Sequence, residues 1–189
     1  MLCAFRLVLV WGLTAGAAPA ACRIALVLAL DVSASVDDEE YRLQAEGTAA
    51  ALLSPKVSQA ILDGNPVALA AFTWSGQDEH ALVADWVVIQ TQASLEVLAA
   101  QLAAFPRPMD GRRRTATGSA LLFARVLLDR APACDRQVID LATDGAKGEK
   151  LLHGPDAFVE QAEGYTDFAR TMTRKLEREL QGVLMGALQ

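Results

Sequence analysis

The chain has few of the residues that common catalytic and nucleic-acid-binding sites need. Its 189 residues include only two histidines, His80 and His153, and neither stands in the paired spacing of a zinc hydrolase. Neither a Gly-x-x-x-x-Gly-Lys-[Ser/Thr] phosphate loop nor a Gly-x-Ser-x-Gly nucleophile turn occurs. Lysine and arginine number 17 against 23 acidic residues, and the single basic run, Arg112 to Arg114, is too short to form the basic stripe that nucleic acids require. The sequence therefore argues against a zinc hydrolase, a phosphate-loop protein and a nucleic-acid partner.

Apolar residues, by contrast, are abundant. They make up 52% of the chain against 21% charged residues, which fits one globular domain with a substantial core. The first twenty residues have the pattern of an export signal, because a short basic region ending at Arg6 precedes a brief apolar core and the small residues Ala18-Pro19-Ala20. This apolar core is too short to span a membrane. We therefore expect residues 1–20 to be removed and residues 21–189 to form one periplasmic or secreted domain without a stable membrane span.

The cysteines predict a disulfide. Cys3 lies within the expected signal, which leaves Cys22 and Cys134. Cys22 precedes Asp31 by almost the same number of residues as Cys134 precedes Asp144. If these two acidic residues end neighbouring strands at the same level, the cysteines meet at the opposite edge of the sheet. An exported protein favours a disulfide between them, and the alternative is a pair of buried free thiols.

The strongest structural signal is the apolar run from Arg23 to Leu30 that ends at Asp31. A run without polar alternation predicts a central strand of a parallel sheet, buried on both faces. The remaining pattern predicts helices over 37–53, 56–62, 94–105, 115–130 and 165–188, a loop over 106–114, and strands over 67–74, 81–89, 137–143 and 157–161. In the helix over 115–130, we expect Leu122, Val126 and Leu127 to face inward.

These elements predict a doubly wound α/β fold. The strands over 67–74 and 81–89 form a hairpin, which supplies one antiparallel edge strand to a mostly parallel sheet of five to six strands. The right-handed crossover rule places the strand over 137–143 beside the first strand. Helices then cover both faces of the sheet, and Asp144 lies next to Asp31 where the strand order reverses.

Asp31, Ser33 and Ser35 follow the central strand and form the candidate site. Ligands of open α/β sheets collect outside the carboxyl ends of the strands. The alternating spacing lets three oxygen-bearing side chains converge, and oxygen ligands suit Mg²⁺, with Mn²⁺ or Ca²⁺ as alternatives. An ordinary alternative remains open at this point, because serine and aspartate are also common where a helix begins.

Three separated motifs resemble a known family. Asp31-x-Ser33-x-Ser35, Thr115 at the start of a helix and Asp144 at the end of a strand stand in the order of the metal-ion-dependent adhesion site (MIDAS) of von Willebrand factor type A (vWA) domains. The phrases Leu-Ala-Leu-Asp-Val-Ser, Phe-Thr-Trp-Ser-Gly and Gly-Pro-Asp-Ala-Phe-Val-Glu are similar to a bacterial exported subgroup of undefined role, the DUF1194 family. The resemblance covers nearly all of the expected mature chain.

The resemblance implies a role for each of these residues. Ser33, Ser35 and Thr115 would bind the cation through their hydroxyls, and Asp31 and Asp144 would hold it largely through water. One coordination position would stay open for an acidic side chain of a protein partner.

The chain departs from the family pattern in two places. Arg113 and Arg114 stand before Thr115, where small residues are usual, and about a helix and a strand are absent after the Asp144 loop.

The interpretation that follows is a binding module rather than an enzyme. The alternatives are a metal-dependent hydrolase in which Asp31 orients water, and a degenerate vWA copy that binds no metal.

Overall fold

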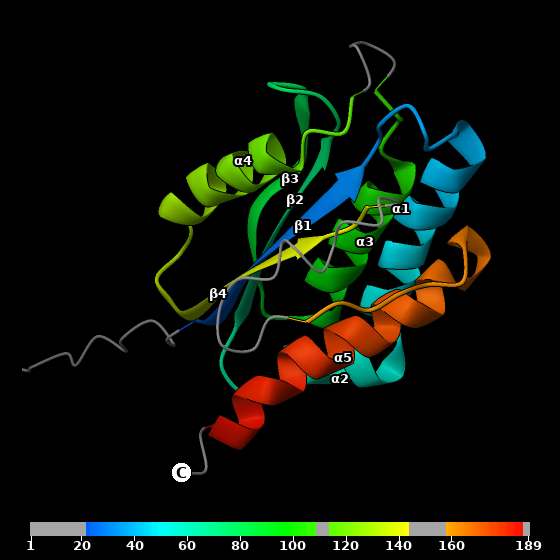
Figure 1. Cartoon of the computed structure of the whole chain (residues 1–189). Helices are drawn as coiled ribbons and strands as arrows, with labels where there is room; N and C mark the ends of the chain where they lie inside the picture. The colour runs from blue at the N-terminus through cyan, green and yellow to red at the C-terminus, as the bar shows by residue number, and fades with distance from the viewer. Residues whose placement is uncertain (1–21, 109–113, 144–157, 187–189) are drawn as a thin grey trace, which may run out of the picture.

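A four-stranded mixed sheet forms the centre of the protein. The computed structural model describes residues 22–108, 114–143 and 158–186, with side chains up to residue 180. Within these residues the strand order is β3-β2-β1-β4, where β1 is Cys22–Asp31, β2 Val67–Trp74, β3 His80–Ile89 and β4 Cys134–Leu141. β1 runs parallel to β2 and to β4, and β3 is antiparallel to β2 at one edge (Figure 1). The predicted hairpin and the predicted neighbour of the first strand are thus confirmed.

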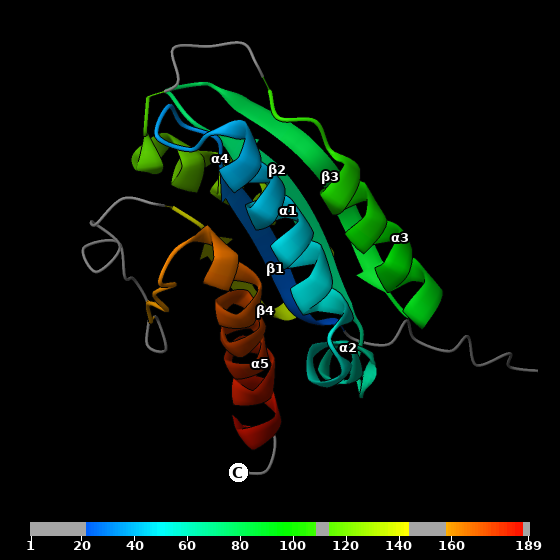
Figure 2. The ribbon, with the colours of Figure 1, turned by 90° about the vertical axis from the view of Figure 1, so that its right-hand side faces the viewer.

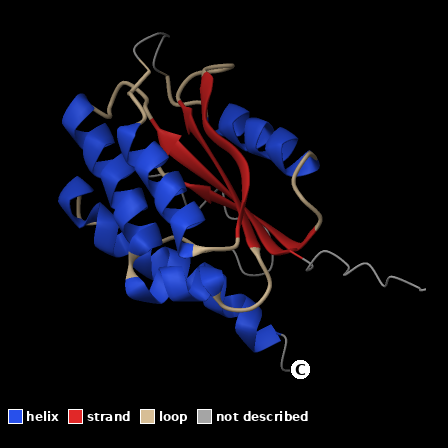
Figure 3. Ribbon diagram, turned by 180° about the vertical axis from the view of Figure 1, so that it is seen from behind, coloured by secondary structure: helices blue, strands red, loops and turns tan. Residues whose placement is uncertain are grey.

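Helices cover both faces of this sheet. One face carries α1 (Asp38–Leu53), α2 (Pro55–Leu62), α3 (Gln92–Ala104) and α5 (Phe168–Gly186), which lie together in front of the sheet in Figure 2. The other face carries α4 (Thr117–Asp129), which stands apart from the remaining helices in Figure 3. This arrangement confirms the predicted α/β fold class.

β1 is buried along its whole length because helices pack on both of its faces. Its larger side chains, at Ile24, Leu26, Leu28 and Leu30, join the core beneath α1, α3 and α5. Its smaller side chains, at Ala25, Val27 and Ala29, join the core beneath α4. A strand of this kind shows no polar alternation in sequence, since neither of its faces meets water.

The face of α4 that packs on the sheet differs from the expected one. Leu127 is buried as predicted, but Leu122 and Val126 are 71% and 58% exposed, and Ala120 and Ala124 face the sheet in their place. On this face β1 has small side chains, so α4 can pack close to the strand. This close packing leaves room only for small residues of α4, such as Ala120 and Ala124, at the contact. The helix is apolar on most sides, so periodicity alone did not distinguish its inner face.

The strand predicted over 157–161 is wrong for its described part, residues 158–161, which are irregular. Side-chain contacts with α5 hold this segment, because the guanidinium of Arg178 lies 3.9 Å above the Phe158 ring and 3.9 Å from a carboxylate oxygen of Glu160. The described sheet accordingly has four strands rather than five to six.

Cys22 and Cys134 form the predicted disulfide. The two residues stand directly opposite each other in the β1–β4 register, with their Cα atoms 4.3 Å apart. The bond therefore joins two neighbouring parallel strands where both begin.

In the part of the chain that the structure describes, we find no helix with the length and apolar character needed to cross a membrane. The predicted signal over 1–20 lies outside that part.

Candidate functional site

The turn after β1 brings three of the predicted site residues together. Asp31 and Ser33 are fully buried, and Ser35 is exposed. The backbone N–H of Ser33 donates to Oδ1 of Asp31 at 2.8 Å, and the hydroxyl oxygens of Ser33 and Ser35 lie 3.3 Å apart. A carboxylate and two hydroxyls thus gather within one turn at the carboxyl end of the central strand.

The structure separates this turn from the start of the following helix. The N-cap of α1 is Asp37, whose Oδ1 accepts the N–H of Glu40 at 2.8 Å. The Glu40 carboxylate in turn accepts the N–H of Asp37 at 2.9 Å, which completes a capping box. The interpretation of Asp31, Ser33 and Ser35 as an ordinary N-cap is therefore wrong.

Backbone contacts place Thr115 at the same end of the sheet. Val32 follows Asp31 and donates its N–H to the carbonyl of Trp74, at the end of β2, at 2.9 Å. The next residue, Ser75, accepts the N–H of Ala116 at 2.7 Å. The exposed Thr115 immediately precedes Ala116, so its segment meets β2 beside the Asp31 turn. The helix itself begins two residues later than predicted, at Thr117.

Asp144 lies outside the described residues. The chain leading to it continues beside β1, because the N–H of Ala142 donates to the carbonyl of Ala29 at 2.9 Å. The structure thus describes four of the five predicted ligands and brings Asp31, Ser33 and Ser35 into contact.

The donor set fits a hard cation. Over the described ranges, no three histidine, cysteine, aspartate or glutamate side chains form a group that could hold a metal ion. A site at this turn would use one buried carboxylate together with neutral hydroxyls. Oxygen donors of this kind suit Mg²⁺ better than they suit zinc or copper.

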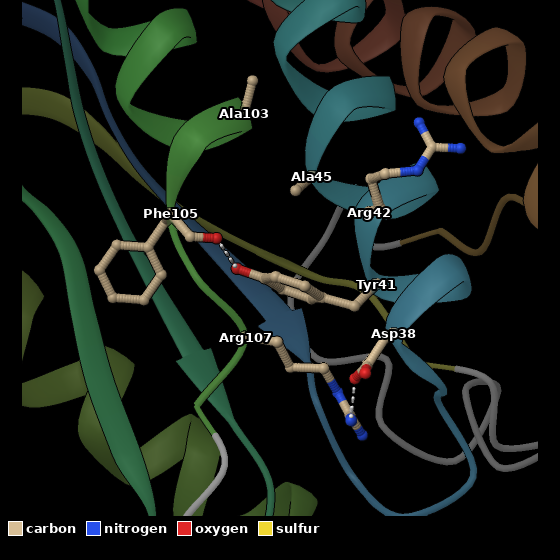
Figure 4. A pocket seen from close by; sticks show the side chains of 7 residues that line it. All are labelled: Asp38, Tyr41, Arg42, Ala45, Ala103, Phe105 and Arg107. Carbon is tan, nitrogen blue, oxygen red and sulfur yellow. Dashed lines mark hydrogen bonds and ion pairs between the residues drawn. The ribbon is translucent and has the colours of Figure 1, made fainter.

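Arg107 is a residue at the site that sequence reasoning missed. It lies in the predicted loop after α3, yet its side chain is only 7% exposed. Its Nη1 donates to Oδ1 of Asp38 at 2.7 Å (Figure 4). Its Nη2 donates to the backbone carbonyls of Ser33, at 3.4 Å, and of Val36. A single arginine between two prolines carries no recognisable signal, so only the folded chain shows this contact.

A pocket of about 330 Å³ lies beside Arg107. Its walls come from α1, from the end of α3 and from the segment that follows α3. They are formed by Asp38, Tyr41, Arg42, Ala45, Ala103, Phe105 and Arg107 (Figure 4). The Tyr41 hydroxyl donates to the carbonyl of Phe105 at 3.1 Å. Burial raises the pKa of Tyr41 to about 12, and the nearby Arg107 opposes part of this shift. The hydroxyl therefore stays protonated and ties the segment after α3 to α1.

A separate cluster of buried charges lies between β4 and α5. Lys175 forms an ion pair with Asp140, and both side chains are largely buried. Glu179 lies nearby on α5, also buried, and its pKa is raised to about 8 by burial and by the Asp140 charge. These residues share the α5 side of the sheet and take no part in the Asp31 turn.

Comparisons with solved structures return neighbours of low similarity. The von Willebrand factor domain of the type V pilus tip protein Mfa5 from Porphyromonas gingivalis is 21% identical, with a TM-score of 0.46, over 66% of this chain and 38% of that one. Proximal thread matrix protein 1 from the mussel byssus is 15% identical, with a TM-score of 0.47, over 85% of this chain and 36% of that one. The chain thus spans well under half the length of either structure.

The comparison with protein families is more informative. No curated protein matches the chain. A family model described as "Protein of unknown function (DUF1194)" matches residues 21–150 and 147–184. These two stretches include the central strand, the Asp31 turn and Thr115, and they cover most of the sequence. The chain therefore belongs to the DUF1194 family, as its motifs predict.

Proposed function

We propose that this protein is an exported protein-binding module that holds a divalent cation, Mg²⁺ in the first place, at the turn after β1. Asp31, Ser33, Ser35 and Thr115, together with Asp144, would hold the ion. The cation would bridge to a carboxylate of a protein partner. The observation that carries the proposal is the convergence of the buried Asp31 and the paired hydroxyls of Ser33 and Ser35 in a turn that does not cap a helix.

The charge balance of this donor set supports binding to an acidic partner. Hydroxyl ligands are neutral, so a cation held by them and by few carboxylates keeps most of its positive charge. An external carboxylate would neutralise this charge and complete the coordination shell. The disulfide between Cys22 and Cys134 supports an oxidising compartment, where such a module would meet its partners.

Calorimetric titration of the folded protein with Mg²⁺ and Mn²⁺ tests the metal site. Ser35→Ala removes one hydroxyl from an exposed position, so we expect it to leave the fold intact and to weaken cation affinity at least tenfold. Asp37→Asn is the matched control, because asparagine caps helices about as well as aspartate and the change removes one neighbouring charge. We expect its affinity to stay close to that of the wild type.

Two results, one from this titration and one from a phosphoesterase assay, would contradict the proposal. Folded wild-type protein that takes up neither ion would favour a degenerate copy without metal. Manganese-dependent hydrolysis of simple phosphoesters that is lost in Asp31→Ala would favour the hydrolase alternative.

A second experiment tests the partner. The protein, immobilised on beads, is incubated with envelope proteins with and without a chelator, and Ser35→Ala beads serve as the comparison. We expect capture that requires both the cation and the Ser35 hydroxyl, and that is lost when the carboxylates of the envelope proteins are first converted to amides. Capture that is insensitive to amidation would refute the carboxylate bridge.

A further inference from the structure

Arg107 connects two distant segments at the candidate metal site. Its backbone follows α3, and its guanidinium reaches the turn between β1 and α1. Nη2 donates to the carbonyls of Ser33 and Val36, the first and last residues of the turn that contains the exposed Ser35. The turn itself has one internal backbone bond, from the N–H of Val36 to the carbonyl of Ser33 at 3.0 Å. Arg107 therefore adds side-chain hydrogen bonds to the one backbone bond within this turn. The conformation of the turn sets the spacing of the Ser33 and Ser35 hydroxyls.

We propose that Arg107 is a positioning residue: its guanidinium holds the Ser33–Val36 turn in its cation-binding shape before any cation arrives. This inference rests on the proposed function, because it assumes that the turn binds a cation. Holding a site in its bound geometry raises affinity by removing the ordering that binding would otherwise require.

The contacts indicate that the backbone carbonyls, rather than the ion pair, carry this effect. Asp38 is 76% exposed, and an ion pair with so exposed a partner contributes little. The carbonyls of Ser33 and Val36 accept from a side chain that is itself buried. Arginine suits this task, since its planar guanidinium presents several donors in a fixed geometry.

Two kinds of contact hold the turn in place: apolar packing of its valines, and the hydrogen bonds from the Arg107 guanidinium. Val36 and Val32 are buried against Tyr41 and Ala45, which anchors both ends of the turn in a small apolar cluster. Ser35, between these ends, faces solvent. Loss of the guanidinium should therefore loosen the backbone hydrogen bonding of the turn, from Ser33 to Val36, while the apolar side chains of Val32 and Val36 keep the turn attached to α1.

Four variants separate the positioning role from general stability. Arg107→Met removes all donors but keeps an apolar stem of similar reach, and Arg107→Lys restores a charge and part of the donor set. Asp38→Asn removes the ion pair alone. Arg42→Met is the matched control, because Arg42 lines the same pocket yet pairs with Glu39 and Glu46 of its own helix.

Two measurements are made on each variant. Hydrogen exchange in the metal-free protein reports the Ser33 and Val36 amides directly, with the α4 amides as the internal reference. Titration with Mn²⁺, followed by electron paramagnetic resonance, reports cation affinity.

We expect Arg107→Met to exchange the Val36 amide at least tenfold faster and to weaken Mn²⁺ binding at least tenfold. Arg107→Lys should recover part of both losses, and Asp38→Asn and Arg42→Met should stay within about twofold of the wild type. Saturating Mn²⁺ should restore the protection of Val36 in Arg107→Met, because the cation and the guanidinium hold the same turn. A merely structural role would not show this restoration.

Failure of this inference is distinguishable from failure of the proposed function. Wild-type protein that takes up no Mn²⁺ refutes the proposed function and the positioning role with it, whereas unchanged exchange and unchanged affinity in Arg107→Met refute the positioning role alone. Equal losses in Arg107→Met and Arg42→Met would also overturn it. If Arg107→Met does not fold, Arg107→Lys decides, since full loss of affinity with normal Val36 protection contradicts the mechanism.

Discussion

Removal of the Cys22–Cys134 disulfide is expected to lower stability by several kcal/mol. The perturbation is the double change Cys22→Ser and Cys134→Ser, with Cys3→Ser in every protein compared so that only this pair of thiols matters. The bond joins residues 112 positions apart along the chain, so it restricts a very large loop of the unfolded state. The two residues are direct register partners on the neighbouring strands β1 and β4, so the strands hold them close together without the bond.

The magnitude follows from the loop length. The chain-entropy relation gives about 4.8 kcal/mol at 25 °C for a loop of this size, and measured losses on removing native disulfides are about 2–5 kcal/mol. A domain of this class has a free energy of unfolding of about 5–15 kcal/mol, so the bond accounts for a large part of it. With a urea dependence of about 2 kcal/mol per molar, the unfolding midpoint should fall by about 1–2.5 M.

Urea unfolding followed by tryptophan fluorescence measures this shift, because Trp74 is fully buried in the native state. A reductant should lower the wild-type midpoint to that of the serine variant and leave the variant unchanged. Midpoints that agree within about 0.2 M for the oxidised wild type and the variant would refute the reasoning, since the bond would then not restrict the unfolded chain.

Three further predictions concern the core. The folded-state pKa of Glu179 is about 8, above the ordinary value of 4.5, so the folded chain keeps a proton that the unfolded chain releases and stability falls as pH rises from about 4.5 to 8. Glu179→Gln should therefore stabilise the protein by about 3 kcal/mol at pH 7 and have little effect below pH 4.5. Urea midpoints of the variant and the wild type, measured from pH 4 to pH 8, test this. A difference between the two midpoints that does not grow with pH would contradict it. Arg23→Met should lower the free energy of unfolding by about 2 kcal/mol, because the buried Arg23 donates to the carbonyls of Asn65, at 3.0 Å, and of Ala60. Thermal unfolding measures this loss, and an unchanged melting temperature would show that these contacts are not stabilising. Gly47→Val should lower the free energy of unfolding by about 2 kcal/mol, since even a Cβ at Gly47 would lie 3.0 Å from Cδ1 of Phe168 and 3.2 Å from the backbone nitrogen of Ala169 on α5. A variant as stable as the wild type would show that α1 and α5 separate at little cost in free energy.

The order and type of most elements follow from the sequence alone. The run from Arg23 to Leu30 predicted a strand buried on both faces, because a short, bounded and continuous apolar run is typical of a parallel strand covered on both sides. The disulfide was predicted from the similar distances of the two cysteines from Asp31 and Asp144, and the strand register places Cys22 directly opposite Cys134. The grouping of Asp31, Ser33 and Ser35 was also predictable, since residues two apart at a strand end lie close together whatever the rest of the chain does.

The tertiary structure decided the features that depend on contacts between distant segments. Which side of α4 faces the sheet depended on the small residues of β1, and the irregular course of 158–161 depended on Arg178 of α5. The reach of Arg107 to the turn after β1 likewise appeared only in the folded chain. The spacing of apolar and polar residues along the chain indicates which residues are buried and which meet water. The features above depend instead on the shape and charge of residues in another segment, and the local sequence does not encode where that segment lies.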